Sequence, residues 1–298
     1  MRLGIDWGGT KMEIIALEET GTEIYRKRVA TPRDDYKGCI ETVADLVSAA
    51  EAETGQTGTV GLGIPGSLSP GTGLVKNANS TWMNGMPLDK DLEARLGRPV
   101  RIENDANCLA VSEATDGAGA GAHVVHAIII GTGSGSGIAI DGKAHRGANG
   151  IAGEWGAIPV PWMTADEFPG PESWTGHRGA IDRWCSGTGF QLDYQERAGE
   201  LLKGDEIMAR KRASEPQAIA AYEAYVHRLA RALAMAANLL DPDVFVLGGG
   251  MSNIDELYDD LAAAMAPYIF SDVYEVPIRK ARHGDSSGVR GAAWLWNT

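Results

Sequence analysis

Two short glycine-rich segments, each lying between apolar stretches, constrain the fold of this chain more than any other feature. The first covers residues 6–11 and has the sequence Asp-Trp-Gly-Gly-Thr-Lys, and the second covers residues 131–137 and alternates glycine with threonine or serine. Strand-like residues precede and follow both segments, so we expect each to be the turn of a β-hairpin. Strands are expected at residues 59–64 and 124–130, with a return strand from Ile138 after the second segment. Apolar residues at helical spacing predict helices over about residues 35–51 and 216–240, and Ser252 with Asp255 is expected to cap a later helix. The sequence therefore predicts two α/β lobes built on one plan.

The predicted boundary and hinge between the lobes is the glycine- and alanine-rich stretch 116–121. We expect an N-terminal lobe of residues 1–117 plus 286–298, and a C-terminal lobe of residues 118–285. A chain of 298 residues is long enough for two separate hydrophobic cores.

Composition excludes several classes of protein. The formal net charge is −13 and no long basic run is present, so we expect no nucleic-acid partner. No apolar run approaches the length of a membrane-spanning helix, and no signal peptide precedes the first strand. The three cysteines, Cys39, Cys108 and Cys185, are widely spaced, which disfavours disulfides and a sulfur-ligated metal site. We therefore expect a reduced, cytoplasmic protein.

The glycine turns have the chemistry of a phosphate site. Glycine lets backbone N–H groups approach phosphate oxygens, and Asp6 could hold a hydrated Mg²⁺. A third glycine site, at residues 248–250, closes a buried strand and could pack beneath an adenosine. The alternatives are a plain hairpin turn for the first segment and a flexible linker for the second. Candidate ATP- or phosphate-binding residues are Gly8, Gly9, Thr10, Lys11, Gly131, Thr132, Gly133, Gly249 and Gly250.

One G-x-G-x-x-G match occurs at residues 61–66. Its apolar residues lie inside the motif, and a long loop follows where a dinucleotide-binding motif needs a helix. We therefore do not expect this segment to bind a dinucleotide.

Six motifs occur in one order along the whole chain, at residues 6–11, 61–66, 103–107, 130–133, 153–156 and 247–250. As a set they resemble the ROK family of bacterial sugar kinases and sugar-responsive repressors. The resemblance implies an α/β chain with the two-lobed actin/hexokinase (ribonuclease H-like) fold, usually a homodimer, that binds ATP with Mg²⁺ and a small-molecule sugar.

Three further stretches, residues 31–36, 76–82 and 283–294, resemble the bacterial fructokinase (manno-fructokinase) group. This likeness implies ATP-dependent phosphorylation of a hexose hydroxyl, with D-fructose converted to fructose 6-phosphate and mannose or glucose as further substrates. Two alternatives stay open, a kinase for an N-acetylhexosamine and a sugar-binding protein that has lost catalysis. A repressor would need a DNA-binding module ahead of the first glycine turn, where we expect no room for one.

The resemblance also assigns roles to single residues. Asp105 is the catalytic base, which the chemistry requires because a hydroxyl is a poor nucleophile at neutral pH. The alternative is that Asp105 only caps the helix that follows it. Asp6 faces Mg²⁺ through water. The implied sugar-binding residues are Gly66, Asn79, Asn104, Asp105, Glu154 and Asp182.

The chain departs from the zinc-bearing members of the family. Ala157 replaces their histidine, the three cysteines are missing from residues 173–182, and Asp182 stands where they carry a glutamate. A Cys₃His site cannot form without its ligands, so we expect no zinc. We expect instead that Trp174 and Trp184 are buried where zinc would lie.

Overall fold

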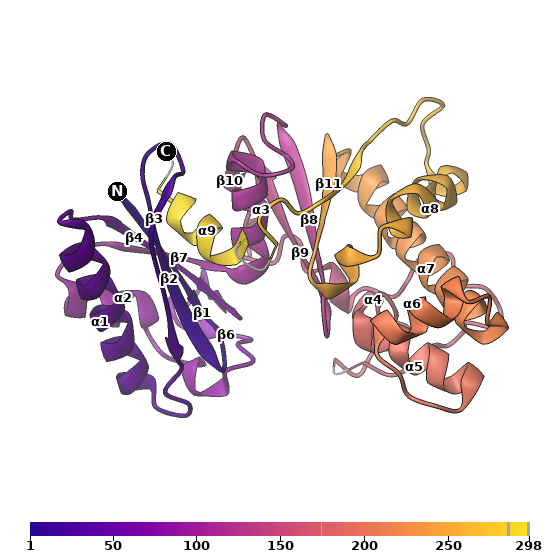
Figure 1. The fold of residues 1–298 in the computed structure, drawn as a ribbon, viewed down its shortest axis with the longest axis horizontal. Coiled ribbons are helices and arrows are strands. Elements are labelled where there is room, and N and C mark those ends of the chain that lie inside the picture. Colours follow the sequence, from indigo (N-terminus) through magenta and orange to yellow (C-terminus); the bar gives the residue numbers. More distant parts are fainter. Residues whose placement is uncertain (174, 285–286, 297–298) are drawn as a thin grey trace. The chain divides into compact units, whose positions relative to one another are not determined.

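The computed structural model describes residues 1–173, 175–284 and 287–296, which form two compact units (Figure 1). Unit 1 consists of Met1–Val125, Gly137–Ala152 and Arg282–Thr298, and unit 2 consists of His126–Ser136 and Gly153–Ala281. Compact packing does not define lobes that move, so the predicted lobe boundary at 117/118 stays a prediction. The other predicted boundary, at 285/286, lies outside the described residues.

Unit 1 is built on a mixed sheet with the strand order β3-β2-β1-β4-β7. Its strands are β1 (Arg2–Trp7), β2 (Lys11–Leu17), β3 (Glu23–Ala30), β4 (Thr59–Ile64) and β7 (Val100–Asn104). The first three are an antiparallel meander, as the sequence predicts, and β4 and β7 run parallel to β1. The carboxyl ends of β1, β4 and β7 therefore meet at one edge of the sheet. A small ribbon of β5 (Ser67–Leu68) and β6 (Val75–Lys76) follows β4.

Helices cover both faces of this sheet. They are α1 (Tyr36–Thr54), α2 (Leu88–Leu96), α3 (Asp105–Thr115) and α9 (Ser287–Trp294). Figure 1 shows α1 and α2 on one side of the sheet and α9 on the other. The Asp35 carboxylate caps α1 by accepting a hydrogen bond from Gly38 N at 2.9 Å. The apolar residues of α1 recur at helical spacing and are buried, which confirms the predicted helix.

Helix α9 packs unusually close to the sheet because two paired strand residues, Gly4 of β1 and Gly61 of β4, have no side chain. A Cβ atom on Gly61 would lie 1.8 Å from Ala292 O, and one on Gly4 would lie 2.1 Å from Val289 O. The first glycine of the G-x-G-x-x-G match thus serves helix packing inside a strand.

Unit 2 contains most of a second sheet, with the strand order β10-β9-β8-β11-β12. The strands are β8 (Val124–Ile130), β9 (Ser134–Ile140), β10 (Lys143–Ala144), β11 (Val244–Gly248) and β12 (Ile278–Lys280). Residues of β8 and β9 belong to both units, and β10 belongs to unit 1. The bounds of β8 agree with the prediction, whereas β9 begins four residues before the predicted start at Ile138.

Helices pack against the unit 2 part of this sheet. They are α4 (Ile181–Trp184), α5 (Gly187–Ala198), α6 (Gly204–Arg212), α7 (Pro216–Leu240) and α8 (Glu256–Met265). The predicted long helix over residues 216–240 is confirmed as α7, whose apolar face includes the buried residues Leu229 and Leu233. The expected capping role of Ser252 for α8 is wrong, because its hydroxyl donates to Gly249 O at 2.7 Å in the preceding 3₁₀ turn. Among helices of the described ranges, none combines the length and hydropathy needed to cross a bilayer.

The close approach of α9 gives a direct test. We expect Gly61→Ala to lower the free energy of unfolding by about 3 kcal/mol, because the new methyl group would overlap the Ala292 carbonyl oxygen. The matched control is Gly71→Ala, where a Cβ atom meets nothing closer than 3.9 Å. Urea unfolding curves measure both changes. Equal midpoints for the two variants would contradict the packing described here.

Candidate functional site

The carboxyl edge of the unit 1 sheet brings together several of the predicted site residues. The strand register places Asp6 beside Gly63 and places Ile64 beside Asn104, the residue before Asp105. The Asn104 side chain donates through Nδ2 to Gly66 O at 3.2 Å. Ligands bind open α/β sheets at such edges, beyond the carboxyl ends of parallel strands.

The residue that caps helix α3 is Asn104. Its Oδ1 accepts hydrogen bonds from Ala106 N at 2.9 Å and from Asn107 N at 3.4 Å. Asp105 is the first helical residue, is only half-buried, and has Oδ1 2.8 Å from Ala106 N. Because Asn104 supplies the cap, the alternative that Asp105 only caps this helix is disfavoured.

A buried carboxylate that sequence reasoning did not single out supports this pair. Glu103 accepts hydrogen bonds from Asn104 N at 2.9 Å and from Asn107 Nδ2 at 3.0 Å. Its other oxygen is paired with the Arg146 guanidinium, which also donates to Ile102 O at 2.6 Å. Glu103 therefore fixes the backbone that leads into Asp105. Arg146 lies 43 residues away in the sequence, so no local pattern could have revealed this ion pair.

Asp6 is a carboxyl group whose ionisation is strongly perturbed. Burial, together with the nearby carboxylates of Asp105 and Glu13, raises its pKa to about 6 against the opposing charges of Lys11 and Arg28. Two carboxylates repel each other at this edge of the sheet, and a divalent cation bound between them would reduce the repulsion. Mg²⁺ takes oxygen ligands and commonly uses one or two carboxylates with phosphates and water. The residues present therefore fit Mg²⁺.

The first glycine turn lies at the end of β1. Gly8 N donates to Lys11 O at 3.0 Å, which closes the predicted hairpin, and the Thr31 hydroxyl donates to Gly8 O at 2.7 Å. Thr10 and Lys11 are exposed, and Gly9 is partly exposed. Asn79, also exposed, lies close by in unit 1 and donates through its backbone to Pro65 O at 3.3 Å.

The second glycine turn, in unit 2, is shorter than predicted. It spans residues 131–133, with a hydrogen bond from Gly131 N to Gly133 O at 2.9 Å. Gly187 N, at the start of α5, donates to Gly131 O at 2.8 Å. Within the part of the chain that the structure describes, the N–H groups of Thr132 and Gly133 have no hydrogen-bond acceptor, and both residues are exposed. Free, adjacent backbone N–H groups are the donors of an anion site.

A cavity of about 570 Å³ opens beside this turn, entirely within unit 2. Met208, Met251 and Ile254 provide apolar walls. The remaining lining residues are glycines or carry polar side chains, and they are Gly131, Thr132, Gly187, Thr188, Gln191, Gly204, Asp205, Arg212, Gly250 and Asn253. Gly249 precedes Gly250 at the end of β11. A cavity that combines an apolar wall with several polar groups, next to free N–H donors, suits a nucleoside attached to phosphates.

The other two predicted sugar ligands also lie in unit 2. Glu154 is exposed and precedes the 3₁₀ turn Trp155–Ala157. Asp182 is partly buried in the first turn of α4, and its Oδ1 accepts a hydrogen bond from Ser134 N at 2.7 Å. The predicted site residues thus fall into two groups, one in each unit.

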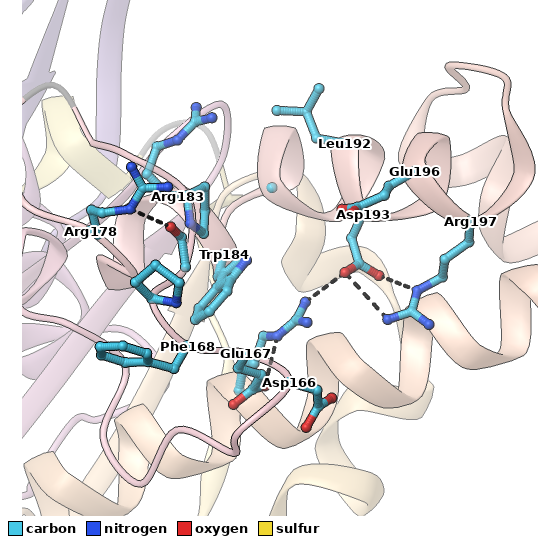
Figure 2. Close-up of a pocket in the computed structure, with 15 residues that line it drawn as sticks. Asp166, Glu167, Phe168, Arg178, Arg183, Trp184, Leu192, Asp193, Glu196 and Arg197 are labelled. Carbon is cyan, nitrogen blue, oxygen red and sulfur yellow. Dashed lines mark hydrogen bonds and ion pairs between the residues drawn. The ribbon is translucent and has the colours of Figure 1, made fainter.

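The segment that would carry zinc in other family members is held by hydrogen bonds and ion pairs. Pro159 and Ala180 form a β-bridge. Glu167 contacts two buried guanidinium groups of α7, Arg228 at 3.0 Å and Arg231 at 2.7 Å. Figure 2 shows this network continuing through Asp193 to Arg197 beside a cavity of about 570 Å³.

This arrangement bears on what replaces zinc. Trp184 is 9% exposed and lies under the Arg228 guanidinium, whereas Trp174 lies outside the described residues. The residues that the structure describes contain no cluster of three or more His, Cys, Asp or Glu side chains placed to ligate a metal. The absence of zinc from the protein stays a prediction.

Solved structures with the same fold identify the class of protein. A ROK hexokinase of Thermus thermophilus superposes with a TM-score of 0.86 and is 29% identical, covering 99% of this chain and 97% of that one. A ROK family glucokinase of Streptomyces griseus, solved with glucose and AMPPNP, gives a TM-score of 0.78 at 29% identity, with 99% and 98% covered. The predicted α/β actin/hexokinase fold is confirmed.

The family model described as the ROK family matches residues 2–298, so the chain belongs to the ROK family. An N-acetyl-D-glucosamine kinase of Haemophilus influenzae is 39% identical over 303 residues, covering 100% of both chains. An N-acetyl-D-glucosamine kinase of Vibrio cholerae is 41% identical over 299 residues, covering 99% of both. The prediction that the protein is an enzyme, a sugar kinase of this family, is confirmed.

These relatives correct the predicted substrate, because the assignment to the fructokinases is wrong. The stretches that led to it make structural contacts in this chain. Thr31 braces the first glycine turn, and Asn84 holds Ala78 through two hydrogen bonds. Arg290 is paired with Asp116 at 2.5 Å. Residues with such structural roles are shared because the family shares a fold. They therefore carry little information about which sugar is bound.

Because the pKa of Asp6 is raised in the folded protein, we expect the free energy of unfolding to depend on pH. The folded protein binds this proton more tightly than the unfolded chain, so the charged carboxylate costs stability above pH 6, and the cost fades as the pH falls toward 4. We expect Asp6→Asn to raise the free energy of unfolding by about 1–3 kcal/mol at pH 8, and by about half as much at pH 5. Urea unfolding of the metal-free protein measures this. A variant less stable than the parent at pH 8 would contradict the account.

Proposed function

We propose that this protein transfers the γ-phosphoryl group of ATP to a hydroxyl of N-acetyl-D-glucosamine. The observation that carries the proposal is the identity of 39–41% to N-acetyl-D-glucosamine kinases over essentially the full length of both chains. The nucleotide-sized cavity beside the second glycine turn supports ATP as the donor. The homodimer and the cytoplasmic location stay predictions.

In this proposal the unit 1 group performs the chemistry on the sugar. Asp105 accepts the proton of the attacking hydroxyl, since a carboxylate within hydrogen-bond reach is the base that such a nucleophile needs. Asn104, fixed by its bonds to Gly66 O and to the start of α3, orients the sugar. Gly66, Asn79 and Glu154 are the further proposed sugar contacts.

The proposed phosphate contacts come from the two glycine turns, Gly8–Lys11 and Gly131–Gly133, and the proposed nucleoside contacts come from Gly249 and Gly250. Asp6 would hold Mg²⁺ through water. When bound, the cation supplies charge neutralisation for the transferred phosphoryl group. Positioning and charge neutralisation account for most of the catalysis of such a reaction.

The substrate assignment is tested by ADP release with Mg·ATP and a panel of sugars. We expect kcat/KM for N-acetyl-D-glucosamine to exceed the values for fructose, mannose and glucose by at least about tenfold, because a pocket built to hydrogen-bond the acetamido group is left unsatisfied by a plain hexose. A preference for fructose, or ADP release that no sugar stimulates, would overturn the proposal.

Asp105→Asn tests the base. We expect turnover to fall by about 10²–10⁴, with the affinity for the sugar and the unfolding midpoint little changed, because the amide keeps the size of the side chain and cannot take the proton. Asp45→Asn, an equivalent change at an exposed position of α1, is the control and should keep full activity. Near-normal turnover of Asp105→Asn would exclude Asp105 as the base.

A further inference from the structure

The Asp182 carboxylate touches the second glycine turn. Its Oδ1 accepts a hydrogen bond from Ser134 N at 2.7 Å, and a Cβ atom added to Gly133 would lie 2.7 Å from the same oxygen. All three residues belong to unit 2. Contact at this range means that the carboxylate and the turn cannot move independently.

Asp182 is itself held on a fixed base. The chain just before it is bridged to Pro159 through Ala180, and Ile181 N donates to Ile158 O at 2.8 Å. Ala180 and Ile181 are completely buried. The backbone that carries the Asp182 carboxylate is therefore fixed by its pairing with residues 158–159.

Hydrogen bonds fix the turn on both sides of its free donors. Gly187 N holds the carbonyl of Gly131 at 2.8 Å, and Asp182 holds the N–H of Ser134. The two exposed residues between these anchors, Thr132 and Gly133, keep their N–H groups free within the described structure. An anion site works best when its donors are oriented before the ligand arrives. Asp182 supplies one of the two anchors that do this.

We propose that Asp182 is a positioning residue that holds the second glycine turn in shape for the phosphates of ATP, through the bond from Ser134 N to its Oδ1. The inference rests on the proposed function, because the turn must bind nucleotide phosphates. It differs from the role that the family resemblance assigns to this position, a contact with the sugar. Oδ1 already accepts the hydrogen bond from Ser134 N, so the turn engages part of this carboxylate. The bond requires an acceptor and does not require a charge.

The two roles separate in binding experiments on the full chain. We expect Asp182→Ala to weaken the binding of Mg·AMPPNP, measured by calorimetry, by about tenfold and to raise the KM for ATP to a similar extent, with the KM for the sugar within about twofold of the parent. Asp182→Asn retains a side-chain oxygen acceptor. We expect it to restore most of the nucleotide affinity, within about threefold of the parent.

A double-mutant cycle with Gly133→Ala sharpens the test. The added methyl group would occupy the place of Asp182 Oδ1, so this variant should weaken nucleotide binding by breaking the same bond. In the Asp182→Ala background the same methyl group has room, and the second change should add little. Strictly additive effects would overturn the inference.

Other outcomes also decide the matter. A raised KM for the sugar with unchanged nucleotide affinity in Asp182→Ala would establish Asp182 as a sugar ligand and overturn the positioning role. If the unaltered protein binds Mg·AMPPNP and phosphorylates no sugar, the proposed function fails, and the calorimetric results still test the inference. If the unaltered protein does not bind Mg·AMPPNP, both fail.

Discussion

The structure depends on a conflict between burial and charge at one edge of the unit 1 sheet. The carboxyl ends of β1 and β7 bring Asp6 and Asp105 near enough for their negative charges to repel each other. Burial, the larger cause, raises the pKa of Asp6 to about 6. A protein that only needed stability would not keep such a pair of carboxylates. The arrangement is stable because the rest of the sheet is closely packed, down to the contact of α9 with two glycines. The repulsion between these carboxylates favours the binding of a cation, and with it a phosphoryl group, at this edge of the sheet.

Much of the architecture could be predicted from local patterns. The strands β4 and β8 and the helix α7 have the predicted bounds, because continuous apolar runs and a 3.6-residue period leave few alternatives. The hairpin turns could be predicted because glycine-rich segments between strand-like stretches are typical of turns. The bounds of β9 and the start of α8 were misjudged. In both places serine and glycine belong to a strand or a tight turn where the pattern indicated a longer loop or a cap.

Long-range pairing explains what the sequence could not show. Glu103 can orient the backbone before Asp105 because its charge is neutralised by Arg146, which lies more than forty residues away in the sequence. Asp182 accepts a hydrogen bond from Ser134 across a similar separation. The ion-pair network of Glu167 with Arg228 and Arg231 links a loop to helix α7, which is distant in the sequence. The sugar was misjudged for a related reason. The stretches resembling fructokinases support turns and ion pairs, so their likeness reflects the fold of the family and carries little information about the sugar.

The central claim is that the Asp105 edge directs a phosphoryl group from ATP to a sugar oxygen. Proton–phosphorus correlation NMR of a reaction containing the unaltered protein, Mg·ATP and N-acetyl-D-glucosamine tests this claim most directly. The account predicts a new phosphate ester resonance, coupled to protons of the sugar, that grows in proportion to ADP. Inorganic phosphate as the sole new phosphorus signal besides ADP would contradict it, because water would then be the acceptor.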